Sequence, residues 1–172
     1  SLKHASKRLR DNRSVVMNSV KTGGRSLQYA SDRLRRDFDI ALTAISESPE
    51  AIQFVSPKLR DDPRLVNKAI SKRGFTLRYL SDYYKNDKRT VMKAVKVHGT
   101  ALQSASRNLK DDFDVVMAAI TKEPFALRYA SSRLKNDQKI GRKVVENDGF
   151  DLQMLGPDVK DNFQVVKVAV QN

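Results

Sequence analysis

Residues 106–112 read Ser-Arg-Asn-Leu-Lys-Asp-Asp, and the pattern Ser-x-x-Leu-(Lys/Arg)-x-(Asp/Asn) returns every 25 residues along the 172-residue chain. The copies follow one another without insertion or deletion and begin at Ser6, Ser31, Ser56, Ser81, Ser106, Ser131 and Gly156. A fixed period of this length is typical of repeat proteins, in which each unit is too small to bury its own apolar face and stacks on its neighbours. We therefore expect residues 1–172 to form a single helical repeat array.

Each unit is expected to contain two short helices. The first has an apolar stripe at spacings of three, four and seven residues, which in the unit starting at Ala101 is made by Leu102, Ala105, Ser106 and Leu109. The second carries its apolar stripe at Val115, Val116, Ala119 and Ile120. A small residue in the middle of the second helix, usually alanine, lets neighbouring helices approach closely.

Two polar series mark the boundary between these helices. A basic residue at the end of the first helix meets the negative end of the helix dipole: Arg10, Arg35, Arg60, Lys85, Lys110, Lys135 and Lys160. Two residues later comes a predicted N-cap of the second helix: Asn12, Asp37, Asp62, Asp87, Asp112, Asp137 and Asn162. Pro63, directly after Asp62, suits the first turn of a helix.

A helix breaker follows each second helix: Gly24, Pro49, Gly74, Gly99, Pro124 and Gly149. We expect glycine to close the helix in the left-handed conformation and proline to open the next one. The predicted fold class is all-α, an α/α solenoid of seven 25-residue two-helix repeats with fourteen short helices. The last two repeats drift at Gly141, Arg142 and Gly156-Pro157, either because constraints relax near an array end, which we favour, or because a kink redirects the surface.

Composition restricts the function classes. The chain has a net charge of +13, no cysteine, and no apolar run approaching the length of a membrane span. Absence of cysteine fits a reducing compartment and equally a secreted protein without disulfides. Ser1–Ser6 already lies inside a repeat and the chain stops where a repeat stops, so we expect a fragment of a longer protein.

The consensus is similar to that of a known repeat family. Leu102-Gln103, Ala105-Ser106, Leu109-Lys110-Asp111-Asp112 and Val115-Val116 with Ala119-Ile120 resemble the domain-of-unknown-function repeat numbered four-one-one-six (DUF4116). This resemblance implies tandem helical repeats within large proteins of protists, intracellular bacteria and large viruses, and no catalytic residue to transfer. It leaves the location open between the cytoplasm and secretion into a host cell as an effector.

Residues typical of catalysis or metal binding do not converge in the pattern. His4 and His98 lie about four repeats apart, and the second aspartate of Asp61-Asp62 and of Asp111-Asp112 is a predicted cap. The recurring serine has no histidine partner and more often packs closely or bonds its own backbone. We expect no enzyme activity, no cofactor and no metal.

Clustered positive charge is the best candidate for a binding surface. Arg64, Lys68 and Lys72, with Arg89, Lys93 and Lys96 in the next repeat, are expected on the outward faces of two successive second helices. A solvated face is the alternative, because Asp39, Glu47 and Asp114 stand at equivalent places in other repeats.

An aromatic series also recurs: Tyr29, Phe54, Tyr79 and Tyr129, each after Gln or Arg. It resembles the side chains of helical-repeat RNA readers, but packing between repeats is the simpler interpretation. We expect a non-catalytic scaffold that binds a protein partner through the six basic residues. Binding of nucleic acid or anionic lipid through the same residues is the alternative, and a spacer between other domains is a third.

Overall fold

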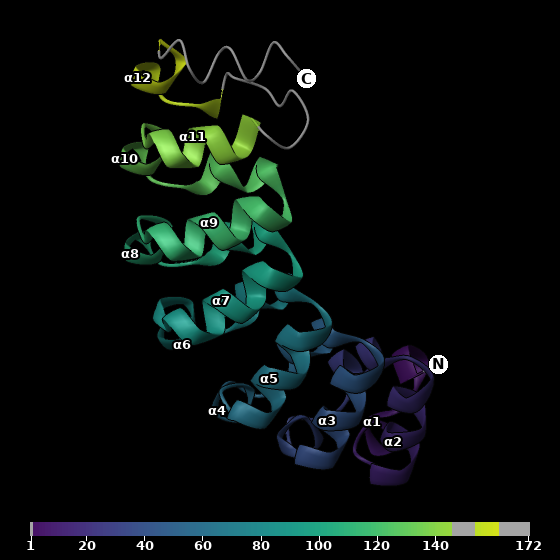
Figure 1. Ribbon diagram of the computed structural model, residues 1–172. Helices are drawn as coiled ribbons and strands as arrows, with labels where there is room; N and C mark the ends of the chain where they lie inside the picture. The colour runs from purple at the N-terminus through teal and green to yellow at the C-terminus, as the bar shows by residue number, and fades with distance from the viewer. Residues whose placement is uncertain (1, 146–153, 162–172) are drawn as a thin grey trace. The chain divides into compact units, whose positions relative to one another are not determined.

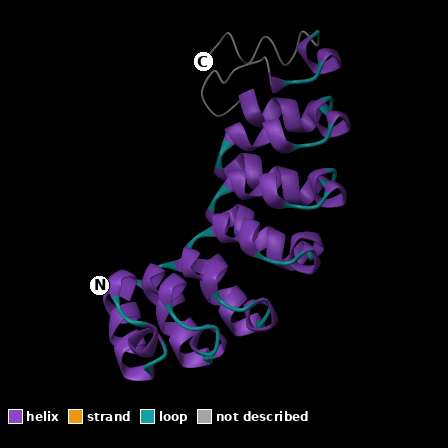
Figure 2. Cartoon of the chain, turned by 180° about the vertical axis from the view of Figure 1, so that it is seen from behind, coloured by secondary structure: helices purple, strands orange, loops and turns teal. Residues whose placement is uncertain are grey.

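Helices are the regular secondary structure of the part of the chain that the computed structural model describes, residues 2–145 and 154–161 (Figure 1, Figure 2). The chain divides into two compact halves, Ser1–Ser81 and Asp82–Asn172. Within the described residues, no helix is long and apolar enough to span a bilayer. The all-α prediction is therefore confirmed for these residues.

The N-terminal half places its long helices side by side, with 3₁₀-helices against them as a second layer (Figure 1). The long helices are α2 (Arg13–Thr22), α3 (Phe38–Glu47) and α5 (Pro63–Lys72). The 3₁₀-helices are η1 (Leu2–His4), η2 (Gly24–Tyr29), η4 (Pro49–Phe54) and η5 (Gly74–Tyr79). Three short elements connect a 3₁₀-helix to the long helix that follows it in the chain: α1 (Lys7–Arg10), η3 (Leu34–Arg36) and α4 (Pro57–Arg60).

The C-terminal half repeats this arrangement. Its long helices are α7 (Lys88–Val97), α9 (Phe113–Lys122) and α11 (Gln138–Val145), which stack in that order (Figure 1). The 3₁₀-helices are η6 (Gly99–Ser104) and η7 (Pro124–Tyr129), and the short helices are α6 (Asp82–Asn86), α8 (Arg107–Lys110), α10 (Ser132–Lys135) and α12 (Pro157–Lys160).

The predicted two-helix repeat is wrong in its first half. Residues 99–109 do not form one α-helix: η6 ends at Ser104, Ala105 and Ser106 are extended with ψ of 157° and 162°, and α8 starts at Arg107. Ser106 caps the new helix, since its hydroxyl accepts a hydrogen bond from the Leu109 N–H. A repeat therefore contains a 3₁₀-helix, a short helix and a long helix.

The apolar stripes predicted from the sequence form the core. Val115, Val116, Ala119 and Ile120 of α9 are fully buried. The 3₁₀-helices contribute one fully buried leucine or isoleucine each from the same place in the repeat: Leu27, Ile52, Leu77, Leu102 and Leu127. Helices this short are unstable in isolation, so burial of these side chains against neighbouring elements supplies their stability.

The predicted cap series is also confirmed. Oxygens of Asn12, Asp37, Asp62, Asp87 and Asp112 accept hydrogen bonds from backbone N–H groups in the first turn of the following long helix. Asp137 does the same for Lys139 and Ile140. The predicted cap Asn162 and breaker Gly149 lie outside the described residues.

Glycine has a different role from the one predicted. Gly24 and Gly99 do not have left-handed backbones, and each opens a 3₁₀-helix instead of closing an α-helix. A Cβ on Gly24 would lie 2.0 Å from the carbonyl oxygen of Ala44, so absence of a side chain permits a close backbone approach. Pro49 and Pro124 begin 3₁₀-helices as predicted.

The glycines of the last repeats also serve packing. Helix α11 runs through Gly141 without a break, and a Cβ there would lie 2.4 Å from Val159 Cγ1. At Gly156 the Oδ1 atom of Asn136 occupies the space of a side chain, 1.7 Å from where a Cβ would be. These departures from the consensus are fitted to the side chains of the adjacent repeat.

We expect Gly24→Ala to lower the free energy of unfolding by about 1–3 kcal/mol, the usual cost of overpacking, because the new methyl meets a backbone carbonyl. The neighbouring Gly23→Ala is the matched control. Its Cβ would have Ser26 Oγ at 3.9 Å as its nearest neighbour, and its extended φ of −171° suits alanine. The control should stay within about 1 kcal/mol of wild type. Equal urea-unfolding midpoints for the two variants would contradict the close-approach explanation.

Candidate functional site

Adjacent repeats are joined by a backbone hydrogen bond at the recurring motif. The N–H of the serine position donates to the carbonyl of the basic residue one repeat earlier. The pairs are Ser31 with Arg10 (3.0 Å), Ser56 with Arg35 (3.1 Å), Ser106 with Lys85 (2.9 Å), Ser131 with Lys110 (3.0 Å) and Gly156 with Lys135 (2.8 Å). Glycine keeps this bond because it uses only the backbone.

The serine hydroxyl works in two repeats at once. Ser131 Oγ accepts a hydrogen bond from the Leu134 N–H of its own short helix and donates to Asp111 in the preceding repeat. Arg133 completes the contact, with Nε 3.0 Å from Asp111 Oδ1. The first junction has the same three residue types, Ser31, Asp11 and Arg33. The sequence interpretation of this serine as a local packing residue was therefore incomplete.

These contacts shift the acidity of the aspartates. Hydrogen bonds from Ser131 and then Arg133 lower the pKa of Asp111 below its ordinary value. Ser31 and Arg33 lower the pKa of Asp11 in the same way. Both aspartates are partly exposed, so the shift reports hydrogen bonding to the charged form and not a buried catalytic acid.

Charged contacts also join the long helices. Arg13 of α2 lies 2.8 Å from Asp37 and 2.9 Å from Asp39 of the next repeat. Lys88 of α7 makes the equivalent pair of contacts, 2.8 Å to Asp112 and 2.9 Å to Asp114. Two of the acidic residues that interrupt the basic series, Asp39 and Asp114, thus pair with a cation of the preceding repeat.

A third set of contacts lies at the 3₁₀-helices. Arg73, just before η5, pairs with Glu50 of η4. In the C-terminal half the N–H and hydroxyl of Thr100 in η6 lie 3.0 Å and 2.7 Å from Glu123, just before η7. Burial opposes ionisation of Glu123, but the hydrogen bonds from Thr100, together with His98 and the Gly99 N–H, outweigh it and the pKa of Glu123 is lowered.

The six predicted partner-binding residues are exposed, three on α5 and three on α7: Arg64, Lys68, Lys72, Arg89, Lys93 and Lys96. Two of them also serve packing between repeats. The Arg64 guanidinium carbon lies 4.0 Å from the centre of the Phe38 ring and pairs with Asp62, while Lys72 Nζ donates to the Ser46 carbonyl. Helices α5 and α7 belong to different halves.

The basic residue that ends a short helix can also be engaged through its side chain, as Arg10 and Arg60 show. Arg10 donates to the Ala5 and Lys3 carbonyls at 3.1 Å and 2.9 Å, and Arg60 donates to the Val55 and Tyr79 carbonyls at 3.2 Å and 3.3 Å. Burial lowers the pKa of Lys110. These contacts add to the interaction with the helix dipole by which we explained this series.

The C-terminal half has an apolar groove that sequence reasoning missed. A pocket of about 510 Å³ between α7 and α9 is lined by Met92, Phe113 and Met117, with Lys96 and Lys122 among its polar residues. The next groove, between α9 and α11, is basic and is lined by Met117, Lys139, Arg142 and Lys143. The sequence signal for this groove was that these apolar residues lie on the long helices but outside the buried stripe of each helix.

The aromatic series remains compatible with packing. Tyr29, Phe54, Tyr79 and Tyr129 are half-buried. Where arginine precedes the aromatic residue, its guanidinium stacks on the ring, at 5.5 Å for both Arg78 on Tyr79 and Arg128 on Tyr129. Within residues 2–145 and 154–161, no three His, Cys, Asp or Glu side chains gather as a metal site.

The geometry defines a tandem helical-repeat protein whose recurring residues join one repeat to the next. The family model described as Domain of unknown function (DUF4116) matches residues 1–35, 12–60, 37–85, 62–110 and 112–141. The chain therefore belongs to the DUF4116 family. Comparison with curated proteins and with solved structures found no match.

We expect Ser131→Ala to lower the free energy of unfolding by about 1 kcal/mol or more, because α10 loses its cap and Asp111 loses a donor. Ser132→Ala, at the exposed neighbouring serine, is the control and should have little effect. Chemical denaturation measures both. The assignment fails if the two serine variants are equally stable.

Acid should weaken the junctions. A carboxyl whose folded pKa is lowered adds stability above its unfolded pKa of about 4, and this stability is lost as the pH falls through the folded value. Asp111→Asn keeps an acceptor for Ser131, as Asn86 does for Ser106 at 2.7 Å. We expect its melting temperature to fall less than that of wild type between about pH 5 and about pH 2. A carboxyl NMR titration that places the pKa of Asp111 at or above about 4 would contradict the contact.

Proposed function

We propose that the chain is a non-catalytic scaffold of seven repeats, arranged as one α-solenoid, that binds a protein partner. The recurring polar residues serve caps and junctions in both halves, which supports a structural use of the motif. The second helix of each predicted pair is the long helix, and its outward positions vary from repeat to repeat. Variable residues on a constant frame are typical of repeat proteins that present a binding surface.

The groove between α7 and α9 carries this proposal. Met92, Phe113 and Met117 give it an apolar floor, and methionine is common at binding surfaces because its flexible side chain adapts to its partner. Lys96, Lys122 and the basic residues of α11 add positive charge around it, and the acidic residue that lines it, Asp114, is paired with Lys88. We therefore propose a partner segment that presents apolar side chains flanked by acidic ones.

A peptide display selection on the whole chain tests this proposal. We expect enrichment of segments that combine apolar and acidic residues, and a loss of affinity of at least about tenfold for Met117→Glu, which places a charge in the apolar floor. Gln103→Glu, at an exposed residue of η6, is the control and should bind normally. Selected peptides that bind Met117→Glu as tightly as wild type would refute the groove.

Binding to a polyanion through the six basic residues is the alternative, supported by the exposure of Lys68, Arg89 and Lys96. Such binding weakens steeply between low and physiological salt. Reversal of Arg64, Lys68, Arg89 and Lys93 to glutamate should abolish it. If RNA, DNA or anionic vesicles bind in this charge-dependent way while peptides do not, the alternative replaces the protein-binding proposal.

A further inference from the structure

The junction at Ser56 lacks the acceptor found in other junctions. The residue equivalent to Asp11 and Asp111 is Arg36, so no carboxylate faces the Ser56 hydroxyl. Ser56 Oγ is buried and has no hydrogen-bond partner, although the Ser56 N–H still bonds to the Arg35 carbonyl at 3.1 Å. An unsatisfied buried hydroxyl is costly and calls for an explanation.

In two junctions the residue two places after the serine is an arginine that pairs with the acceptor in the preceding repeat. Arg33 pairs with Asp11 and Arg133 pairs with Asp111. In the Ser56 junction the equivalent residues are Lys58 and Arg36, both cations and both exposed. The Ser56 junction therefore has two cations and an unpartnered hydroxyl, where two other junctions have one cation and an aspartate carboxylate.

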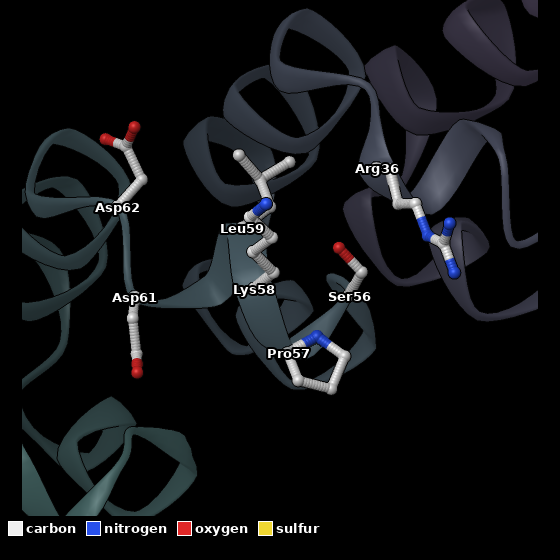
Figure 3. A pocket seen from close by; sticks show the side chains of 7 residues that line it. All are labelled: Arg36, Ser56, Pro57, Lys58, Leu59, Asp61 and Asp62. Carbon is white, nitrogen blue, oxygen red and sulfur yellow. The ribbon is translucent and has the colours of Figure 1, made fainter.

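These residues line a pocket of about 710 Å³ in the N-terminal half, with Pro57 and Leu59 as apolar walls (Figure 3). Asp61 and Asp62 also line it, but Figure 3 shows them beyond the opposite end of α4 from Ser56 and Arg36. The Asp62 carboxylate is already used, since it caps α5 and pairs with Arg64 at 2.8 Å. The Ser56 and Arg36 side of the pocket is therefore positive.

A second junction, at Ser81, has an unpartnered serine hydroxyl but not the two cations. Ser81 Oγ is also buried without a partner. Its junction, however, retains Asp61 at the acceptor position and has Tyr83 in place of the cation. An unpartnered serine hydroxyl and two cations therefore occur together at the Ser56 junction but not at the Ser81 junction.

We propose that the pocket at Arg36, Ser56 and Lys58 binds a carboxylate, the side chain of an Asp or Glu in a partner protein segment. The carboxylate takes the place that Asp11 and Asp111 fill in their junctions, and it accepts hydrogen bonds from the Ser56 hydroxyl and the two cations. Pro57 and Leu59 contact the methylene groups of the acidic side chain. The pocket lies in the half of the chain that does not contain the α7–α9 groove, so it stands independently of that proposal.

The test uses the whole chain and a tetraglutamate peptide with blocked ends, titrated at low salt and followed by NMR. Tetraglutamine is the neutral control peptide. Arg36→Asp supplies the missing carboxylate from within, so we expect loss of binding by at least about tenfold together with a higher melting temperature. Arg36→Gln removes the cation without adding an acid and should also weaken binding. Arg8→Asp makes the same charge change at an exposed arginine of α1 and should bind like wild type.

The proposal is overturned if wild type binds tetraglutamate no better than tetraglutamine, or if both Arg36 variants bind like wild type. Equal weakening by Arg8→Asp would show that only net charge matters, which also overturns it. Tighter binding of inorganic phosphate than of the peptide at Arg36 and Lys58 would replace the carboxylate by a phosphate ligand. None of these results depends on Met117, so the experiment distinguishes failure of this proposal from failure of the groove proposal.

Discussion

The hydrogen bond from the serine N–H to the carbonyl of the basic residue one repeat earlier is the contact on which the junctions depend. In the five described junctions where it forms, it fixes one short element against the previous one. At Ser131 the serine hydroxyl, the acceptor Asp111 of the preceding repeat and Arg133 are arranged around it. Because it uses backbone atoms, it survives where Gly156 replaces serine. The side chains around it are then free to change, provided that they change in pairs.

Paired change explains features that look irregular in the sequence. Asp39 and Asp114 interrupt a basic series, yet each meets a cation of the preceding repeat, Arg13 or Lys88. Gly141 accompanies Val159 in the same manner, since the missing side chain makes room for the valine. In these pairs, the residue in one repeat matches the charge or size of the residue that it meets in the adjacent repeat. The Ser56 junction differs because Arg36 and Lys58 do not compensate each other.

Much of the architecture could be predicted because it rests on local chemistry. The long helices, their buried stripe and their caps follow from spacing and from the ability of Asp and Asn to accept bonds from free amides. The break before the short helix could not be read from the apolar stripe, since Leu102 and Leu109 are buried whether the segment is one helix or two. Pro57 and Pro157, at the first position of α4 and α12, were the sequence signal for that break.

The sequence by itself determined the period, the all-helical class, the caps and the DUF4116 membership, because each depends on residues close together in the chain or on repetition. Only the tertiary structure decided which polar residues meet across a junction, since partners such as Ser131 and Asp111 lie 20 residues apart. It also decided where charge stays uncompensated. Arg64 looks like a free base in the sequence but lies against Phe38, whereas Arg36 lines a pocket and replaces the Asp or Asn found at its position in other junctions. Contacts between neighbours, not composition, separate a structural charge from one available to a ligand.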